Sequence, residues 1–254
     1  MTITLDFLPQ TAFSFILIFA RTGAMSMALP GIGDRMVPPR IRLVFALALS
    51  LILFPLVSQV FPSLPTSLFG MISLVIGEVL VGLAIGFSVQ IVVAAIQFTG
   101  ATIAFQTGLA FAQNVDPANG IQNSLFSTFL SLLTVALIFA TNLHHLLLSA
   151  IHDSYFLFRP GSILPTGDFA QVAVQTLSGG FAIAIQLAGP FLAFGLIFYL
   201  GVGVLSRLIP QVQVFFLAMP LNIMLGIILF MLLLGTLMTR FLDYFGEALR
   251  PYLA

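Results

Sequence analysis

Long apolar runs separated by short polar breaks make up most of this chain. Each run is near the roughly 20 residues that cross a hydrocarbon core of about 30 Å. No stretch outside the runs is long enough to bury a core of its own. We therefore expect an all-α integral membrane protein in which residues 1–254 form a single membrane domain. The pattern predicts about six hydrophobic helical segments, near residues 8–29, 41–61, 68–112, 123–150, 174–205 and 212–238, and a short C-terminal tail over 239–254.

The third segment is too long for a simple span. An unbroken helix over residues 68–105 would extend on the order of 55 Å, so it either projects beyond the hydrocarbon or breaks near Gly100. One face of this helix carries small and polar residues at steps of three or four. Such a face allows close helix packing in membranes, either against other subunits around an aqueous route or within the chain's own bundle. Its members are Glu78, Gly82, Gly86, Gln90, Ala94, Gln97 and Ala101.

A polar, glycine-rich run from Gln97 to Gly120 separates the third apolar segment from the fourth. Non-helical backbone at membrane depth leaves N–H and C=O groups unpaired, and it is tolerated only where protein buries it or where it lines a water-filled path. This run therefore predicts a passage or a tight assembly rather than a surface that faces lipid.

Prolines and polar residues interrupt the last two segments. Pro190 follows Gly189 within the fifth segment, where its ring and its missing N–H favour a kink. We therefore expect kinked or interrupted helical hairpins, an arrangement that also occurs in secondary transporters with a substrate site at the membrane midplane. The residues of the polar turn and of the interrupted sixth segment are Arg207, Pro210, Gln211, Pro220 and Asn222.

Glu78 is an acid inside an apolar segment. Its insertion costs a few kcal/mol, which makes it a candidate functional residue that binds a proton or pairs with an arginine. The alternative is a neutral, hydrogen-bonded structural acid. Arg21, inside the first segment, is a candidate partner within the same chain.

The composition agrees with a membrane protein and narrows its partners. Hydrophobic residues make up 60% of the chain, charged residues only 6%, and the mean hydropathy is +1.17, whereas about a quarter of a soluble domain is charged. The formal net charge is +0, so there is no basic face for nucleic acid. The absence of cysteine excludes disulfides and thiolate metal sites. The positive-inside rule places the loop with Arg35, Arg40 and Arg42 in the cytoplasm, although Arg240 and Arg250 fit that orientation poorly.

Motifs for catalysis are missing from the sequence. It contains no P-loop, GxSxG or HExxH pattern, so we expect a protein that is not an enzyme and uses no cofactor or metal. His144, His145 and His152 with Asp153 form a histidine cluster near the end of the fourth segment. An interfacial position at that end is one interpretation, and a metal site or proton relay is the other.

Three stretches follow one another in a distinctive order. The first, from Arg21 to Leu49, reads RTGAMSMALPGIGDRMVPPRIRLVFALAL. The second joins GEVLVGLAIGF at 77–87 to QTGLAFAQNVDP at 106–117, and the third is RLIPQVQVFFLAMPL at 207–221. Together with Asn142-Leu-His-His and Gly189-Pro190, they resemble the FliR/SctT family of type III secretion export-apparatus membrane proteins over nearly the whole chain.

This resemblance implies a subunit of the type III protein export channel of the bacterial flagellum, packed in a helical multisubunit export gate. It implies FliP and FliQ as partners in a pore complex, FlhB and FlhA as further components of the export apparatus, and exported flagellar proteins as substrates. It also implies a location in the bacterial inner membrane, at the flagellar basal body.

The resemblance further assigns a plug-like loop to residues 108–120, which would close the channel from within. We expect Phe111 to fill the lumen, and Gly108 and Pro117 to fix the shape of the loop. Substrates would pass when the loop moves aside, driven by partners, because this chain contains no motor. The loop residues are Gly108, Phe111, Gln113, Asn114, Asp116 and Pro117.

Three alternatives stay open at this point. The chain could serve a virulence injectisome instead of a flagellum, since both belong to the same family. It could be a self-contained secondary transporter, in which broken helices and Glu78 bind a small solute. It could also be a structural membrane scaffold in which the polar loop is merely buried.

Overall fold

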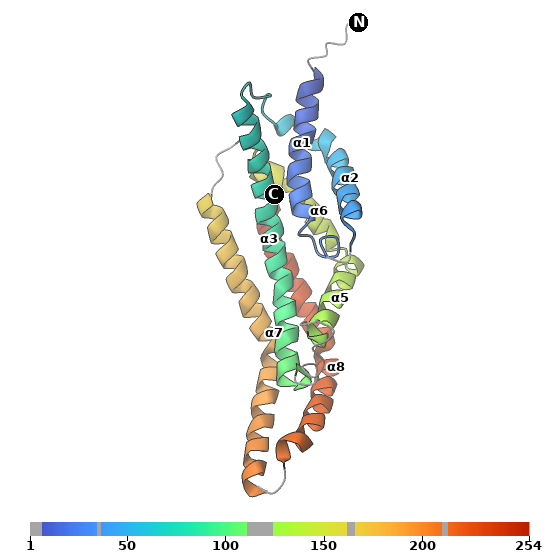
Figure 1. Ribbon diagram of the computed structural model, residues 1–254, viewed down its shortest axis with the longest axis vertical. Helices are drawn as coiled ribbons and strands as arrows, with labels where there is room; N and C mark the ends of the chain where they lie inside the picture. Colours follow the sequence, from blue (N-terminus) through green and yellow to red (C-terminus); the bar gives the residue numbers. More distant parts are fainter. Residues whose placement is uncertain (1–6, 35–36, 111–123, 162–165, 210–212, 254) are drawn as a thin grey trace. The chain divides into compact units, whose positions relative to one another are not determined.

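A computed structural model describes residues 7–34, 37–110, 124–161, 166–209 and 213–253 of the chain (Figure 1). These residues form helices and connecting turns, with no strand among them. The helices are α1 (Phe7–Ser26), α2 (Pro39–Val57), α3 (Leu68–Gln106), α5 (Leu125–Ala140), α6 (His144–Leu157), α7 (Thr166–Leu208) and α8 (Val214–Leu249), with short 3-10 turns η1 (Ser58–Val60) and η3 (Arg250–Tyr252). The expected all-α fold is confirmed.

Each predicted segment corresponds to one helix, except the fourth. That segment is divided into α5 and α6 by a short turn in which Asn142 has a φ of 61°. Asparagine tolerates this left-handed conformation better than most residues. The turn bends the pair, so α5 and α6 are a broken span rather than one helix.

Neither the possible break near Gly100 nor the interruption expected at Pro220 occurs in the helices. The third segment does not break near Gly100, because α3 continues through it to Gln106, and α8 runs through Pro220. Pro190 lies inside α7, and the kink expected there stays a prediction. Helices in membranes tolerate proline where neighbouring groups satisfy the backbone carbonyls that it leaves unpaired.

The end of the sixth segment was predicted too early. Helix α8 continues past residue 238 to Leu249, so much of the expected tail is helical. Phe241, Phe245 and Leu249 recur at steps of four and are buried, which is the spacing of a helix that buries one face.

Four of the described helices are long and apolar enough to cross a membrane, namely α2 with η1, α3, α7 and α8. The count rises to five if the bent pair of α5 and α6 forms one span. Helix α1 is not among them; it carries Gln10, Arg21 and several hydroxyl side chains. The chain is a membrane protein, and its helix α1 is less apolar than these four spans.

The chain divides into two compact units, and α3, α5, α7 and α8 each contribute residues to both. The first unit comprises residues 1–92, 139–177 and 246–254. In it α1 lies beside α2 (Figure 1), and the two are joined by a hydrogen bond between Thr22 Oγ1 and Ser50 Oγ at 2.9 Å. Tyr252 of η3 donates its hydroxyl to Ser88 Oγ of α3 at 2.7 Å. These contacts tie α1 to α2 and η3 to α3 within the first unit.

The second unit comprises residues 93–138 and 178–245. Phe230 of α8 lies 4.6 Å from the Phe126 ring of α5 and 6.4 Å from the Phe191 ring of α7, measured between centroids. Gly100 of α3 meets α5, because a Cβ at this position would lie 2.5 Å from the Cα of Ser127. The missing side chain lets α3 and α5 approach closely, which explains why Gly100 lies within a helix instead of ending one.

Candidate functional site

A fully buried arginine lies at the centre of the first unit. Arg21 of α1 is 1% exposed and donates to both carboxylate oxygens of Glu78 in α3, from Nε at 2.6 Å and from Nη2 at 3.1 Å. Nη1 donates to the carbonyl and the hydroxyl of Ser154 at 2.7 and 3.3 Å, and Nη2 donates to the carbonyl of Phe158 at 2.8 Å. A guanidinium has five N–H donors, so these five hydrogen bonds satisfy it completely.

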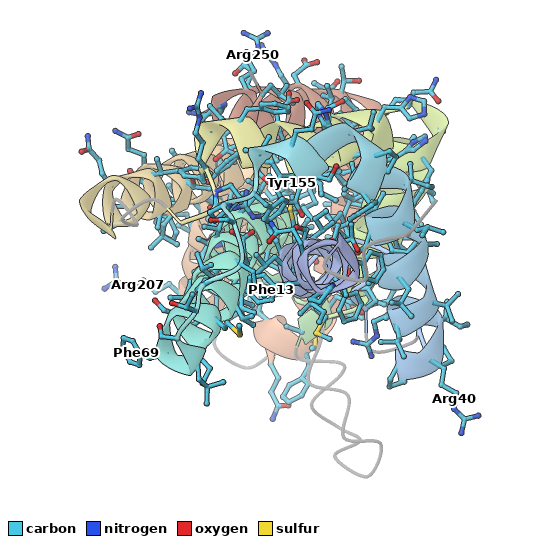
Figure 2. All side chains as sticks on the ribbon, turned by 90° about the horizontal axis from the view of Figure 1, so that it is seen from above. Phe13, Arg40, Phe69, Tyr155, Arg207 and Arg250 are labelled. Carbon is cyan, nitrogen blue, oxygen red and sulfur yellow. The ribbon has the colours of Figure 1, made fainter. Side chains whose placement is uncertain are left out.

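An aromatic ring closes this site. Tyr155 of α6 is fully buried, as its inward position in Figure 2 indicates, and its ring centroid lies 4.3 Å from Arg21 Cζ. Its hydroxyl donates to the carbonyl of Ile18 at 3.2 Å. A cation stacked on an aromatic face is stabilised further where water is excluded. We call Arg21, Glu78, Ser154 and Tyr155 the arginine centre.

The small and polar face of α3 meets α1 of the same chain over its first half. A Cβ at Gly82 would collide with the carbonyl oxygen of Arg21, and one at Gly86 would lie 2.7 Å from the Cβ of Ala28. Gln90 Nε2 donates to the carbonyl of Ala28 at 2.8 Å. Of the two interpretations, packing within the chain's own bundle therefore holds for Glu78, Gly82, Gly86 and Gln90.

The second half of this face is different. Ala94, Gln97 and Ala101 are exposed on the chain, although the backbone carbonyl of Gln97 accepts a hydrogen bond from Ser127 Oγ at 2.8 Å. Contact with another subunit remains a prediction for these three residues.

A second buried polar group lies in the second unit, where α3 ends. Asn222 of α8 is 2% exposed, and its Nδ2 donates to the carbonyl of Gln106 at 3.2 Å and to the Tyr199 hydroxyl at 3.4 Å. Its Oδ1 is buried and accepts no hydrogen bond from any residue that the structure describes. A cavity of about 10 Å³, the volume of roughly one water molecule, adjoins Asn222, Tyr199 and Gly108.

Two glycines hold the end of α3 against α7 and α8. A Cβ at Gly195 of α7 would collide with the side chain of Gln106, and one at Gly226 of α8 would collide with the side chain of Thr107. Gly108 follows with a φ of 76°, and a Cβ there would lie 3.2 Å from Asn222 Nδ2. A positive φ favours glycine at the residue that ends a helix. We call Gln106, Gly108, Tyr199 and Asn222 the asparagine junction.

The model of the bacterial export proteins, family 1, matches residues 12–248 of this chain. The chain belongs to this family. Both buried polar sites lie inside the matched residues, and the match includes parts of all the described helices.

Individual relatives are flagellar proteins. The chain is 42% identical over 233 residues to the flagellar biosynthetic protein FliR of Caulobacter vibrioides, covering 92% of this chain and 93% of that protein. It is 31% identical over 247 residues to FliR of Bacillus subtilis, with 95% of each chain covered. FliR of Escherichia coli is 30% identical over 209 residues, which cover 82% of this chain and 78% of that protein. The family resemblance seen in the sequence is thus confirmed.

Several predicted positions of this export-family chain lie outside the described residues. Gly108 is described, whereas the remaining expected loop residues are not, and neither are Pro210 and Gln211 of the predicted turn. Arg207 is exposed in the last turn of α7. The expected loop residues outside the described ranges are Phe111, Gln113, Asn114, Asp116 and Pro117.

The histidines of this export-family chain lie at two places along α6: the rings of His144 and His145 are 4.2 Å apart, between centroids, and His152 lies beside Asp153. His144 stacks on Phe139 with ring centroids 5.1 Å apart, and His152 Nδ1 lies 2.8 Å from Asp153 Oδ1. Within the described residues, no three His, Asp, Glu or Cys side chains are grouped to hold a metal ion. The interfacial position of His144 and His145 stays a prediction.

Two members of these sites had no distinct signal in the sequence. Ser154 and Tyr155 follow the histidines in α6 and stand out by no motif, yet both contact Arg21. Asn222 was noted as an interruption of the sixth segment, but it is a buried hydrogen-bond donor. A polar residue deep in an apolar segment is the signal that could have identified Asn222, because such a residue needs a partner.

Proposed function

We propose that this chain is a subunit of the type III protein export channel of the bacterial flagellum, and that it helps to form the pore and to close it. The observation that carries the proposal is the family match over residues 12–248. The names of the three relatives, all flagellar biosynthetic proteins, favour the flagellum over the injectisome.

The asparagine junction supports a gate in the segment that follows it. Gln106 and Thr107 are held by the glycines of α7 and α8, and Asn222 binds the last carbonyl of α3. A segment that closes a pore needs a fixed base, so that its position is set by the fold and not by its own chain entropy. In the proposed function, residues 108–120 close the pore and Phe111 fills its lumen.

The proposal extends to partners and location. FliP and FliQ would complete the pore, FlhB and FlhA would be further components of the export apparatus, and exported flagellar proteins would be the substrates. The complex would lie in the bacterial inner membrane at the flagellar basal body. The chain acts here as a conduit and gate without catalytic activity. Exposed apolar side chains on several helices provide surface for lipid or for such partners, for example Leu196, Ile197 and Leu200 on α7.

Membrane leakage tests the gate. Phe111→Ala is expected to make cells expressing the full complex permeable to small ions, because it removes the largest apolar side chain of the closing segment. Phe69→Ala is the matched control, since Phe69 is 83% exposed at the opposite end of α3. Unchanged permeability with Phe111→Ala, or equal leakage from both variants, would contradict the gate.

Recovery of partners tests the assembly. The tagged chain, extracted in mild detergent from its own host, is expected to co-purify with two small hydrophobic proteins in a multisubunit complex. A stable, monodisperse monomer or homodimer would reject the export channel and favour the transporter. Co-purification with injectisome components would assign the chain to that system instead.

A further inference from the structure

A largely apolar groove lies between α1 and α2 in the first unit. Its volume is about 340 Å³, and its apolar wall includes Phe19, Gly23, Met27 and Leu43. Met27 and Leu43 are 64% and 52% exposed, so the groove opens outward. Gly23 leaves space in the wall, because a Cβ there would meet only the Phe19 ring, at 4.0 Å. Helix α2 is apolar enough to cross a membrane, so lipid can reach its exposed face.

Two arginines stand at the end of the groove where α2 begins. Arg40 and Arg42 both line it, and none of the described residues that line it is acidic. Arg42 Nε donates to the carbonyl of Val37 at 3.1 Å, which holds this side chain near the start of α2. Arg40 is exposed and extends outward from the helix (Figure 2). An apolar groove with positive charge at one end is complementary to a phospholipid, which has apolar acyl chains and an anionic headgroup.

We propose that the groove binds an anionic phospholipid, with an acyl chain between α1 and α2 and the phosphate beside Arg40 and Arg42. Guanidinium groups pair with phosphate through forked hydrogen bonds, and basic pockets between membrane helices hold anionic headgroups. The positive-inside rule places these arginines on the cytoplasmic side, where anionic lipids carry the surface charge. A neutral lipid would fill the apolar part equally well but would gain nothing from the arginines.

The first experiment removes the charge of the arginines and measures lipid affinity directly. The full chain, extracted with its bound partners, is titrated with phosphatidylglycerol or phosphatidylcholine, and the bound lipid is counted by native mass spectrometry. One arginine near anionic lipid contributes about a fivefold change in affinity. Arg40→Gln is therefore expected to weaken phosphatidylglycerol binding about fivefold, and Arg40→Gln with Arg42→Gln about 25-fold, with little change for phosphatidylcholine.

The control for charge is Arg250→Gln, because Arg250 is exposed in η3 and does not line the groove. It removes the same charge and is expected to leave phosphatidylglycerol binding unchanged. A thermal unfolding curve for each variant checks that the fold is retained. If Arg40→Gln with Arg42→Gln binds phosphatidylglycerol as the unmodified chain does, or if Arg250→Gln weakens binding equally, the proposal is wrong.

The second experiment fills the groove with a larger side chain and leaves the arginines in place. The Cβ of Gly23→Leu would meet only the Phe19 ring, at 4.0 Å, so the helix is expected to fold, and the rest of the leucine side chain is expected to exclude the acyl chain. Loss of tight phosphatidylglycerol binding supports the groove, and retained binding overturns it. A photo-crosslinker at Leu43 should capture lipid in native membranes. Capture of a protein there would mean that a protein partner occupies the groove, and the proposal would be wrong.

Discussion

The arginine centre and the asparagine junction are both buried and polar, but they differ in how completely they are satisfied. Arg21 uses all five of its N–H groups, and its partners come from α3, α6 and the residue that follows α6. Asn222 makes two long hydrogen bonds, and its Oδ1 accepts none from the described residues.

This difference indicates different tasks. A buried charge that keeps every partner fixes one arrangement of its helices, since any opening exposes an unpaired ion in an apolar medium. A neutral amide with weak bonds can be released at small cost. The arginine centre therefore holds a permanent part of the fold, whereas the asparagine junction holds the end of α3, next to the segment that we propose to move.

The largest expected effect comes from removing one member of the ion pair. Arg21→Met leaves Glu78 buried without its partner and is expected to cost about 3–5 kcal/mol. Arg21→Met combined with Glu78→Leu removes both charges and should recover most of that loss. Thermal unfolding of the purified chain measures both. A single variant as stable as the unmodified chain would mean that the pair does not fix the helices.

The next effect tests the contact beside the pair. Gly82→Ala places a methyl group against the carbonyl of Arg21, so α1 and α3 must separate, at an expected cost of about 1–3 kcal/mol. Gly235→Ala is the matched control, because nothing lies within 4 Å of a Cβ there, and it is expected to be neutral or slightly stabilising. Equal stability of the two variants, measured by unfolding, would show that the approach of α1 and α3 is loose.

A smaller effect is expected at the asparagine junction. Asn222→Ala removes two long hydrogen bonds and a little packing, for an expected loss of about 1–2 kcal/mol. The same unfolding measurement compares it with Arg21→Met. If the two losses were equal, the contrast between a permanent and a releasable site would disappear.

The smallest effect is expected from removing a single neutral hydrogen bond in the first unit. Tyr252→Phe removes the hydroxyl that donates to Ser88 at 2.7 Å and keeps the buried ring. Its expected cost is about 0.5–1 kcal/mol. A loss as large as that of Arg21→Met, seen in the unfolding curve, would mean that η3 and not the arginine centre secures this unit.

The helical fold could be predicted from hydropathy alone, because a long apolar run in a membrane must satisfy its backbone hydrogen bonds internally, and a helix does so within one segment. The helix ends were harder to predict. Pro220 and Gly100 are helix breakers by local preference, yet both lie inside helices. At Gly100 the backbone of α5 lies so close that a side chain would not fit, whereas Pro220 is exposed and no contact among the described residues explains its helical position. Local sequence carries no information about such neighbours.

The two sites were predictable to different degrees. Arg21 and Glu78 could be paired as candidates because charges in apolar segments are few and costly. Ser154 and Phe158 could not be predicted, since their shortest hydrogen bonds to Arg21 are accepted by backbone carbonyls, which every residue has. The role of Asn222 depends on where α3 ends, and that end is set by Gly108 together with the glycines of α7 and α8.

The partners of Arg21 also impose an order on biogenesis. Arg21 lies in the first helix, Glu78 follows 57 residues later, and the carbonyl of Phe158 follows 137 residues later. Because a chain emerges from the ribosome N-terminus first, α1 is synthesised long before its countercharge exists. An arginine alone in hydrocarbon is costly, so α1 must wait at the membrane surface or in the translocation machinery until α3 and α6 arrive. Helix α1 is therefore made before α3 and α6 but reaches its final position only after them.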